Sequence, residues 1–331
     1  MRKLVMVLTI LFTLSLLNSN ITTASSTLTI TLSTSKQTYN LGETVQIYGN
    51  LTLNGVIVTD GLVAIQINSP NLQRYVLRTI ETGTLTNQNW TAEILSVYTC
   101  DQYENPKTSF QRGTTAYAKI TWKNNLQTPI YILVALYIEF PSNIPFQAFA
   151  PVTGTINPGE SYTTVSIPIP SNAPIGTCML YANLYDNWPK DSGTPYCPEK
   201  TTSFTITSTG STSLFEKPPQ YNTLSTNNFN ITFNLPKTGG QMGNYTIFAT
   251  SHYNGEKTSK TTSFNVTLIG DINHDGLVDI RDISTVGRAY GSYPGHERWN
   301  PVADLNKDNI VDIRDISTVG RDYGKSGTYY T

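Results

Sequence analysis

The sequence predicts a mainly β protein: two β-sandwiches, one inserted in the other, followed by a small α-helical module. From residue 26 to residue 266, short alternating apolar and polar runs are separated by Gly, Pro and Asn, which is typical of all-β sandwiches. Near the C-terminus, VDIRDISTVGR at 278–288 recurs unchanged at 311–321. A chain of 331 residues is long enough for two or three domains.

The first 25 residues have the pattern of a secretory signal peptide. Arg2 and Lys3 precede an apolar run from Leu4 to Leu17, and a polar stretch then ends near Ala24. As a helix this run would be only about 21 Å long, which is too short for a bilayer core. An uncleaved anchor is the alternative, but the short apolar run favours cleavage. We therefore expect a secreted or surface-associated mature chain with no membrane span.

The outer sandwich is predicted to be discontinuous. Four strand-like runs occur at 28–32, 44–53, 62–68 and 75–80, and four strands do not close a sandwich. Further runs appear only at 229–235, 243–253 and 261–266. We therefore assign 26–84 and 212–268 to one domain, because insertion at an exposed loop is well tolerated. Three domains in series are the alternative, and pairing of strand 62–68 with strand 245–251 would distinguish the two.

The insert, residues 85–211, has its own strand-like runs and contains all three cysteines. The runs are 92–98, 116–122, 130–140, 161–169, 175–185 and 202–207. Cys178 shares a strand face with apolar neighbours, which indicates a buried thiol. Cys100 and Cys197 lie at strand ends, so they are the candidate disulfide of an exported protein. The sequence has no closely spaced set of Cys and His residues, so a zinc site is not expected.

The duplicated segment carries two acidic loops 33 residues apart, each followed by a short helix. Oxygen-bearing side chains fall at loop positions 1, 3, 5, 9 and 12, and the carbonyl at position 7 completes the set that an EF-hand loop offers to Ca²⁺. The predicted ligands are Asp271, Asn273, Asp275, Leu277, Asp279 and Asp282 in the first loop, and Asp304, Asn306, Asp308, Ile310, Asp312 and Asp315 in the second. Because clustered carboxylates repel one another, we expect two Ca²⁺ sites on which the folding of this segment depends.

Two details distinguish these loops from calcium sensors. Position 12 is Asp rather than Glu, and position 6 is Gly276 in the first loop but Asn309 in the second, which predicts a weaker second site. No amphipathic helix precedes either loop. The segment 269–325 therefore resembles a type I dockerin module, a resemblance that covers about 55 residues, with 326–331 as a tail. The order of the earlier strands resembles bacterial Ig-like or macroglobulin-type domains.

The dockerin resemblance implies a cohesin-domain protein as the partner, bound through the helix faces by either copy. Positions 10 and 11, which help to set partner choice in dockerins, are Ile and Arg here, where well-known dockerins often have Ser or Thr. The expected partner-binding residues are Ile280, Arg281, Arg288, Ile313, Arg314 and Arg321. Gly287 and Gly320 inside the helices would cost about 1 kcal/mol each relative to Ala, which suggests close approach of the twin helix or of the partner. Asp279 and Asp312 can also cap the helices, and Ile283, Val286 and Tyr290 share one face.

Catalytic residues are not expected. A glycosidase needs two carboxylates, and the candidates are Asp101, Glu104, Glu139 and Glu199. These residues fit solvated loops equally well. No nucleophile or phosphate-binding motif is present. The net charge of −1 favours neither nucleic acid nor an anionic membrane. Exposed aromatics such as Trp188 could stack on sugars, although most aromatics in strands pack in cores.

We therefore predict a non-catalytic, calcium-dependent assembly or adhesion protein. The alternatives are a carbohydrate-binding subunit of a polysaccharide-degrading, cellulosome-like complex that binds polysaccharide or a cell-surface glycan, and, third, a glycoside hydrolase.

Overall fold

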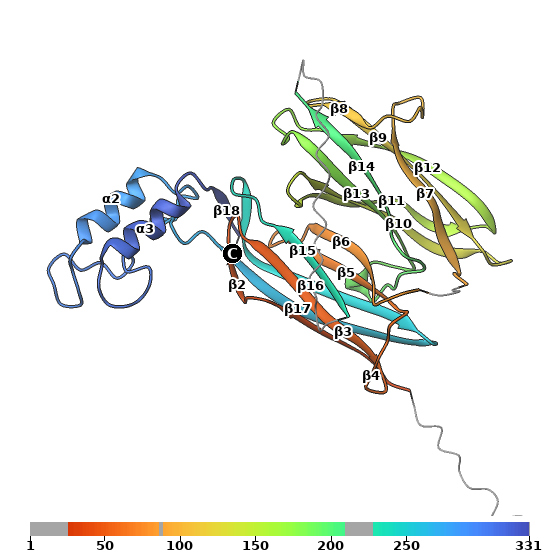
Figure 1. Ribbon diagram of the computed structural model, residues 1–331, viewed down its shortest axis with the longest axis horizontal. Coiled ribbons are helices and arrows are strands. Elements are labelled where there is room, and N and C mark those ends of the chain that lie inside the picture. The colour runs from red at the N-terminus through yellow and green to blue at the C-terminus, as the bar shows by residue number, and fades with distance from the viewer. Residues whose placement is uncertain (1–25, 86–88, 209–227, 331) are drawn as a thin grey trace, which may run out of the picture.

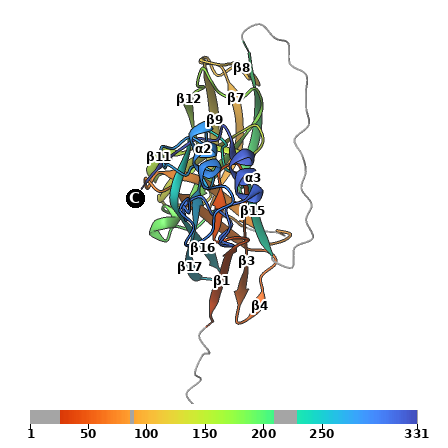
Figure 2. The ribbon, with the colours of Figure 1, turned by 90° about the vertical axis from the view of Figure 1, so that its left-hand side faces the viewer.

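The computed structural model describes residues 26–85, 89–208 and 228–330, so the predicted signal peptide lies outside the described residues. The predicted fold class is confirmed: the structure is mainly β, with two helices near the C-terminus. Figure 1 shows two sheet-rich regions packed against each other and the helices projecting from one end. Figure 2 shows the same arrangement from the side of the helices.

The first β-sandwich is built from strands on both sides of residues 85–211. One sheet contains β1 (Leu28–Thr34), β3 (Thr44–Leu53), β4 (Val56–Ile57) and β15 (Phe229–Asn234). The other contains β2 (Thr38–Asn40), β5 (Leu62–Asn68), β6 (Arg74–Glu81), β16 (Gly240–Tyr253), β17 (Glu256–Thr267) and β18 (Gly327–Tyr329). β16 pairs antiparallel with β5, with Thr246 opposite Asn68 and Thr250 opposite Ala64. β15 likewise pairs with β3, so segments about 180 residues apart share one sheet.

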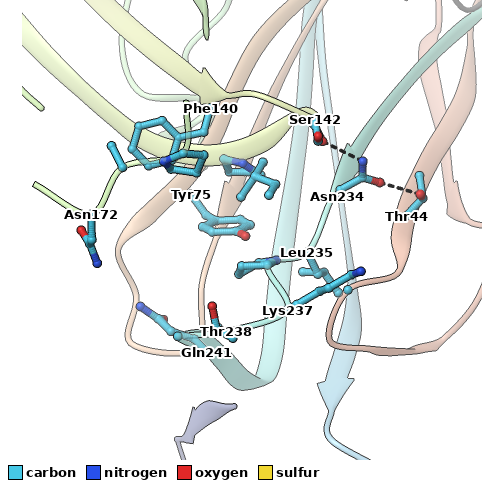
Figure 3. Close-up of a pocket in the computed structure, with 18 residues that line it drawn as sticks. Thr44, Tyr75, Phe140, Ser142, Asn172, Asn234, Leu235, Lys237, Thr238 and Gln241 are labelled. Atoms are coloured by element: carbon cyan, nitrogen blue, oxygen red, sulfur yellow. Dashed lines mark hydrogen bonds between the residues drawn. The ribbon is translucent and has the colours of Figure 1, made fainter. Parts of the chain in front are cut away.

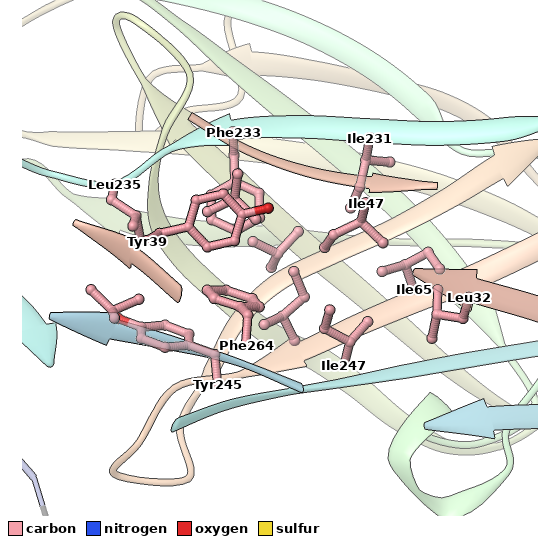
Figure 4. Close-up of a cluster of buried hydrophobic side chains, with 14 of the residues drawn as sticks. Leu32, Tyr39, Ile47, Ile65, Ile231, Phe233, Leu235, Tyr245, Ile247 and Phe264 are labelled. Atoms are coloured by element: carbon pink, nitrogen blue, oxygen red, sulfur yellow. The ribbon is translucent and has the colours of Figure 1, made fainter. Parts of the chain in front are cut away.

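The core of this sandwich follows directly from the alternation in the sequence. In β1, every second side chain is buried, as expected when one sheet face packs inward. Figure 4 shows Leu32, Ile47 and Ile231 of one sheet meeting Ile65 and Ile247 of the other. A group of aromatic rings extends this core at one end: the Phe264 ring lies 5.4 Å from that of Tyr39 and 5.1 Å from that of Tyr245.

The insert forms a second pair of sheets with a core of its own. One sheet contains β7 (Ala92–Cys100), β9 (Thr115–Asn124) and β12 (Gly159–Pro168). The other contains β8 (Ser109–Gln111), β10 (Ile130–Phe140), β11 (Ile144–Ile156), β13 (Gly176–Tyr185) and β14 (Lys200–Thr207). A short 3-10 helix, η1 (Pro189–Asp191), follows β13.

Strand β10 is buried on both faces, which explains its unbroken apolar run. Ile132, Val134 and Leu136 point into the core of the insert. Leu133, Ala135 and Tyr137, which alternate with them, belong to the core of the first sandwich. Since alternate residues of a strand face opposite sides, the insert is packed onto the first sandwich through this sheet.

Three features of this region differ from expectation. Strand β8, which has only three residues, was not predicted. Strand β11 was not predicted, because Pro145, Pro151 and Gly154 interrupt its pattern; it lies at the sheet edge, where proline is tolerated. The predicted disulfide is not formed: Cys100, Cys178 and Cys197 are all buried free thiols. The Cys197 sulfur instead accepts a hydrogen bond from the Ile94 amide at 3.4 Å.

The C-terminal module contains α2 (Ile280–Ala289) and α3 (Ile313–Asp322), which pack against each other. They lie at the end of the molecule remote from the insert (Figure 1). The segment expected to be a tail, residues 326–331, instead contributes β18, which pairs in parallel with the start of β16.

Candidate metal centre and partner-binding helices

The first acidic loop is folded around its own carboxylates. Asp271 accepts hydrogen bonds from the backbone amides of Asp275, at 3.2 Å, and Gly276, at 2.8 Å. Asn273 accepts one from Asp275, and Asp275 accepts one from Leu277, at 2.9 and 3.1 Å. These bonds turn the loop so that side chains at positions 1, 3 and 5 lie on its inner side. The second loop has the same bonds: Asp304 accepts from the amide of Asn309 at 2.9 Å, where Asp271 accepts from that of Gly276.

Position 12 closes each loop from the first turn of the helix. Asp282 is fully buried, and it accepts hydrogen bonds from the amides of Ile272 at 2.9 Å and Asp279 at 2.8 Å. Asp315 does the same in the second loop, with Leu305 and Asp312 at 2.8 Å each. The aspartate at position 12 therefore ties the loop entry to the helix start.

The donor set fits a divalent cation. Asp271, Asp282, Asp304 and Asp315 are 1%, 0%, 7% and 0% exposed. None of them forms an ion pair with a cationic side chain in the part of the chain that the structure describes. Burying an unpaired carboxylate is costly, so a bound cation is the group that would balance these charges. Oxygen donors of this kind are those that Ca²⁺ prefers.

The remaining predicted ligands are four partly exposed carboxylates, those of Asp275, Asp279, Asp308 and Asp312, together with neutral oxygen donors. Within the described residues, no three His, Cys, Asp or Glu side chains converge closely enough to hold a metal by themselves. The predicted set also includes the amide oxygens of Asn273 and Asn306 and the carbonyls of Leu277 and Ile310. Ca²⁺ accepts mixed carboxylate, amide and carbonyl shells, and this loop offers all three.

Asp279 and Asp312 cap the helices, as predicted. Asp279 accepts from the Arg281 amide at 2.8 Å, and Asp282 completes a capping box. The Arg281 guanidinium also binds the carboxylates of Asp279 and Asp275, at 2.8 and 2.7 Å. The hydrogen bond from Arg281 lowers the pKa of Asp279. Arg314 binds Asp312 and Asp308 in the same way, at 2.7 Å each.

The arginine at position 11 was predicted only as a partner contact, so its role inside the loop was missed. The repeated D-x-R spacing at 279–281 and 312–314 was the available indication.

The helices present matching exposed faces. Ile280 and Ile313 are 60% and 59% exposed at the helix starts. Arg288 and Arg321, near the helix ends, are also exposed. A Cβ added at Gly287 or Gly320 would meet nothing within 4 Å, so the twin helix is not the reason for either glycine.

The buried face of each helix contains fewer residues than predicted. Val286 and Val319 are fully buried, and Ile283 and Ile316 are packed against the same core. Tyr290 differs from the expected position: it is 44% exposed and forms the C-cap of α2. The tyrosine therefore belongs to the accessible surface of the module.

The residues weighed as catalytic candidates are engaged in internal contacts. Asp101 accepts hydrogen bonds from the amides of Tyr103 and Asn105, and Glu104 forms an ion pair with Lys119. Glu139 is 3% exposed, and burial raises its pKa. Glu199 pairs with Arg78 at 2.6 Å between the two sandwiches.

Glu139 lies between two tyrosine hydroxyls, which donate to it at 2.9 Å from Tyr137 and 3.0 Å from Tyr181. Trp188 packs onto the first sandwich, with the Arg74 guanidinium 4.0 Å from its ring centroid. These contacts place both residues in the junction between the sandwiches rather than on an open surface.

Comparison with known proteins identifies the C-terminal module. The family model described as "Dockerin type I domain" matches residues 269–322, which confirms the resemblance predicted for this segment. Dockerin domains bind calcium, and a dockerin domain supports docking onto cohesin. No match was found among curated proteins. Among the described residues, no helix is both long and apolar enough to cross a membrane.

Similar solved structures match only parts of the chain. An alkylpurine DNA glycosylase AlkC from Pseudomonas fluorescens matches at 8% identity and TM-score 0.28, covering 36% of this chain and 31% of the glycosylase. The C-terminal domain of wzt matches at 8% identity and TM-score 0.30, covering 42% and 85%. A Niemann-Pick type C2 protein from Japanese carpenter ant matches at 11% identity and TM-score 0.27, covering 37% and 96%.

Proposed function

We propose that this protein is a secreted, non-catalytic assembly or adhesion protein that docks, in the presence of Ca²⁺, onto a cohesin-bearing scaffold or surface protein. The dockerin domain is the docking element, with one Ca²⁺ in each of its two loops. The two sandwiches, which we interpret as Ig-like domains at 26–84 with 212–268 and at 85–211, are the cargo. Dockerin-bearing proteins are typically extracellular or assembled at the cell surface, which supports the proposed location.

The observation that carries this proposal is the open space beside Gly287 in the first helix and beside Gly320 in the second. Glycine inside a helix costs about 1 kcal/mol relative to alanine. No neighbour within the described part of the chain requires Gly287 or Gly320, since no atom of it outside the helix lies within 4 Å of a Cβ at either position. Close approach of a second molecule is a reason for both. The isoleucine and arginine at the start of each helix supply an apolar anchor and a charged rim around that approach.

The internal contacts of the acidic residues support a role without catalysis. A general acid or base needs a carboxyl group that a substrate can reach. Glu139 lines a hollow of about 550 Å³, but it is only 3% exposed and accepts hydrogen bonds from two tyrosines, and Glu199 is held by Arg78. This arrangement is that of a structural network at a domain junction.

The proposal is tested with the full chain as bait in a pulldown from the native secretome, with Ca²⁺ or with chelator. A cohesin-bearing protein should be captured only with Ca²⁺. Replacing Ile280, Arg281, Ile313 and Arg314 by alanine together should weaken capture by about 100-fold or more, since such residues are typical interface hot spots.

Changing one copy at a time is the matched control, because the other copy keeps an intact face. Calorimetry should show two Ca²⁺ sites in wild type and in the fourfold variant, and one after Asp304→Ala. Undiminished capture by the fourfold variant would reject this interface, and absence of Ca²⁺ binding would reject the proposal as a whole.

A hollow between the sandwiches favours polysaccharide binding as a second candidate function. It has a volume of about 700 Å³ and lies where β6, the β10–β11 turn and the β15–β16 connection meet (Figure 3). Tyr75 and Phe140 supply aromatic surface, and Asn172 and Gln241 supply amides. Among its described lining residues, Lys237 alone carries a formal charge. Aromatic, amide and hydroxyl groups without carboxylates suit a neutral sugar.

Sedimentation with insoluble polysaccharides tests this second function. Asn172→Ala and Gln241→Ala should each weaken retention by about tenfold, equivalent to about 1.4 kcal/mol. Asn244→Ala is the matched control, because this exposed amide lies on β16 outside the hollow. Equal retention of all three variants would argue against the hollow as the sugar site.

A further inference from the structure

The two copies of the repeat differ at few positions, and the differences are not scattered. Between 271–291 and 304–324, five positions differ, and two of them exchange one aliphatic side chain for another. The other three change the chemistry: His274 becomes Lys307, Gly276 becomes Asn309 and Ala289 becomes Asp322. At each of these positions one copy contacts a part of the protein outside the repeat: His274 and Gly276 in the first copy and Asp322 in the second.

The C-terminal segment, residues 325–330, lies between the first loop and the sandwich. On one side it is bound to the loop: the Gly327 amide donates to the Gly276 carbonyl at 2.9 Å, and the Val278 amide donates to the Lys325 carbonyl at 3.0 Å. On the other side its residues 327–329 form β18, which pairs with β16 of the sandwich. Among the described residues, the second loop has a counterpart of only one of these bonds: the Val311 amide donates to the Ser292 carbonyl at 3.0 Å, but no amide donates to the Asn309 carbonyl and no strand lies between this loop and the sandwich.

Gly276 is required by this segment rather than by the loop. A Cβ at Gly276 would lie 2.5 Å from the Gly327 carbonyl oxygen, a distance that real side chains do not adopt. The second loop shows that the turn itself accepts a side chain, because Asn309 occupies the same position at a φ of 68° and is exposed. Glycine is therefore retained in the loop that is covered.

The segment also reaches a predicted Ca²⁺ ligand. The Tyr329 hydroxyl donates to the Asp271 carboxylate at 2.8 Å, and the Tyr329 ring meets the His274 ring edge-on at 5.6 Å. Asp271 is 1% exposed, whereas its counterpart Asp304 is 7% exposed. A hydrogen bond to a ligand from outside the coordination shell orients that ligand.

Asp322 joins the end of α3 to the sandwich. It is fully buried and accepts hydrogen bonds from the Asn40 side-chain amide and, at 2.7 Å, from Lys325. Asn40 in turn accepts one from the Ile269 amide at 3.1 Å, where the chain enters the first loop. Ala289, the counterpart of Asp322, offers no polar side-chain atom for such contacts.

We propose that the two Ca²⁺ sites have become specialised: the first is a structural site sealed against the sandwich by residues 325–330, and the second is an exposed, readily exchanging site. Tyr329 is a positioning residue for the first site, and Gly276 is the position that admits the C-terminal segment. Release of Ca²⁺ from the first loop then requires this segment to separate from the loop. This inference rests on the Ca²⁺ binding proposed above.

The test is Ca²⁺ release from the full chain, followed by stopped flow into an excess of a fluorescent chelator. Wild type should show a fast and a slow phase, and Asp304→Ala should remove the fast one. Gly276→Asn should accelerate the slow phase by about tenfold, because the asparagine side chain displaces the covering segment. Asn309→Gly makes the reciprocal exchange in the open loop and should leave the slow phase unchanged.

Tyr329→Phe provides a second, milder variant that keeps the ring and removes only the hydroxyl. It should accelerate the slow phase by about threefold, as expected for loss of one hydrogen bond. Circular dichroism with Ca²⁺ should show both variants folded. Should Gly276→Asn fail to fold, the result for Tyr329→Phe decides.

Two bound Ca²⁺ ions released at equal rates, or a slow phase unaffected by Gly276→Asn or by Tyr329→Phe, would overturn the specialisation while leaving the docking function intact. A chain that binds no Ca²⁺ would instead overturn the docking function first.

Discussion

The sandwiches and the dockerin domain are held together by different physical means. In the sandwiches, apolar side chains from facing sheets form continuous cores, as in the cluster around Ile47, Ile65 and Phe264. In the dockerin domain only a few apolar side chains are buried, among them Val286 and Val319; they join the core of the first sandwich, and acidic side chains are buried beside them. Burial of apolar surface stabilises the first kind of structure in any ionic condition, whereas the second depends on a counter-charge. We therefore expect the sandwiches to keep their stability without Ca²⁺ and the dockerin domain to lose it.

Removal of Ca²⁺ should have the largest effect and should separate the two regions. With chelator, residues 271–324 of the full chain should become protease-sensitive, because the buried carboxylates then repel one another without a cation between them. The sandwiches should stay resistant. Limited proteolysis with mass spectrometry locates the cuts, and Mg²⁺ in place of Ca²⁺ is the control ion. Equal protease resistance of the dockerin domain with and without Ca²⁺ would show that its stability does not depend on the ion.

The junction between the sandwiches should respond next most strongly. Arg78 and Glu199 are 18% and 12% exposed and lie 2.6 Å apart, and Arg78 also lies 3.8 Å from the Tyr181 ring centroid. Arg78→Ala leaves Glu199 without its cation, which should destabilise the sandwiches by about 3–5 kcal/mol.

Thermal unfolding should show this loss in the sandwich transition, with the Ca²⁺ affinity unchanged. Arg78→Lys, which keeps the charge but not the forked geometry, should lose less. A variant whose dockerin domain weakened equally would show that the two regions are not independent.

Alkaline pH should destabilise the sandwiches more than the dockerin domain, in which the described residues include no cysteine. Burial raises the pKa of Cys178 and of Cys197 from 9.0 to about 12. Above pH 9 the unfolded chain loses these protons while the folded chain keeps them, so stability is complete below pH 9 and falls towards pH 12. The expected loss is about 1 kcal/mol per thiol for each pH unit.

Urea unfolding at pH 8, 9 and 10 measures this slope, and a double Cys178→Ala, Cys197→Ala variant should make it shallower, with a remaining contribution from Cys100, whose pKa burial also raises. Alkylation of the unfolded chain without reductant should label all three cysteines. A bridged pair would contradict the free thiols seen in the structure.

The smallest expected effect is a gain in stability. Gly287→Ala and Gly320→Ala should each stabilise the helix by about 1 kcal/mol, because the added methyl group meets open space. The same changes should weaken capture of the partner if these positions are where it approaches closely. Calcium-saturated thermal unfolding measures the first effect and the pulldown the second. Stabilised variants with unaltered capture would place the partner on another face.

Features set by local pattern could be predicted from the sequence. Alternation predicted most strands of both sandwiches, and the spacing of oxygen-bearing side chains in 271–282 was sufficient to identify the acidic loops. The glycine and asparagine at position 6 were also recognised as a difference between the loops. The reason for this difference could not be predicted from the sequence. It is the contact of Gly276 with Gly327, which joins the loop to a segment that has no strand pattern of its own.

Features set by tertiary contacts could not be predicted. The segment 326–330 has little apolar alternation, and its residues 327–329 form β18 only because the start of β16 is available beside them. The free state of Cys100 and Cys197 depends on where two strand ends lie in space, which spacing along the chain does not define. The pairing of Arg281 with the loop carboxylates likewise requires the helix to start where it does.

The double burial of β10 has a consequence for how the molecule can be rearranged. Domains inserted at loops are often treated as cassettes that can be excised or exchanged. Here, excision of 85–211 would expose the apolar side chains that now meet Leu133, Ala135 and Tyr137, and it would leave Arg78 without Glu199. The remaining half-molecule would be prone to aggregate through that uncovered face, so the two sandwiches have to be kept together when the protein is engineered.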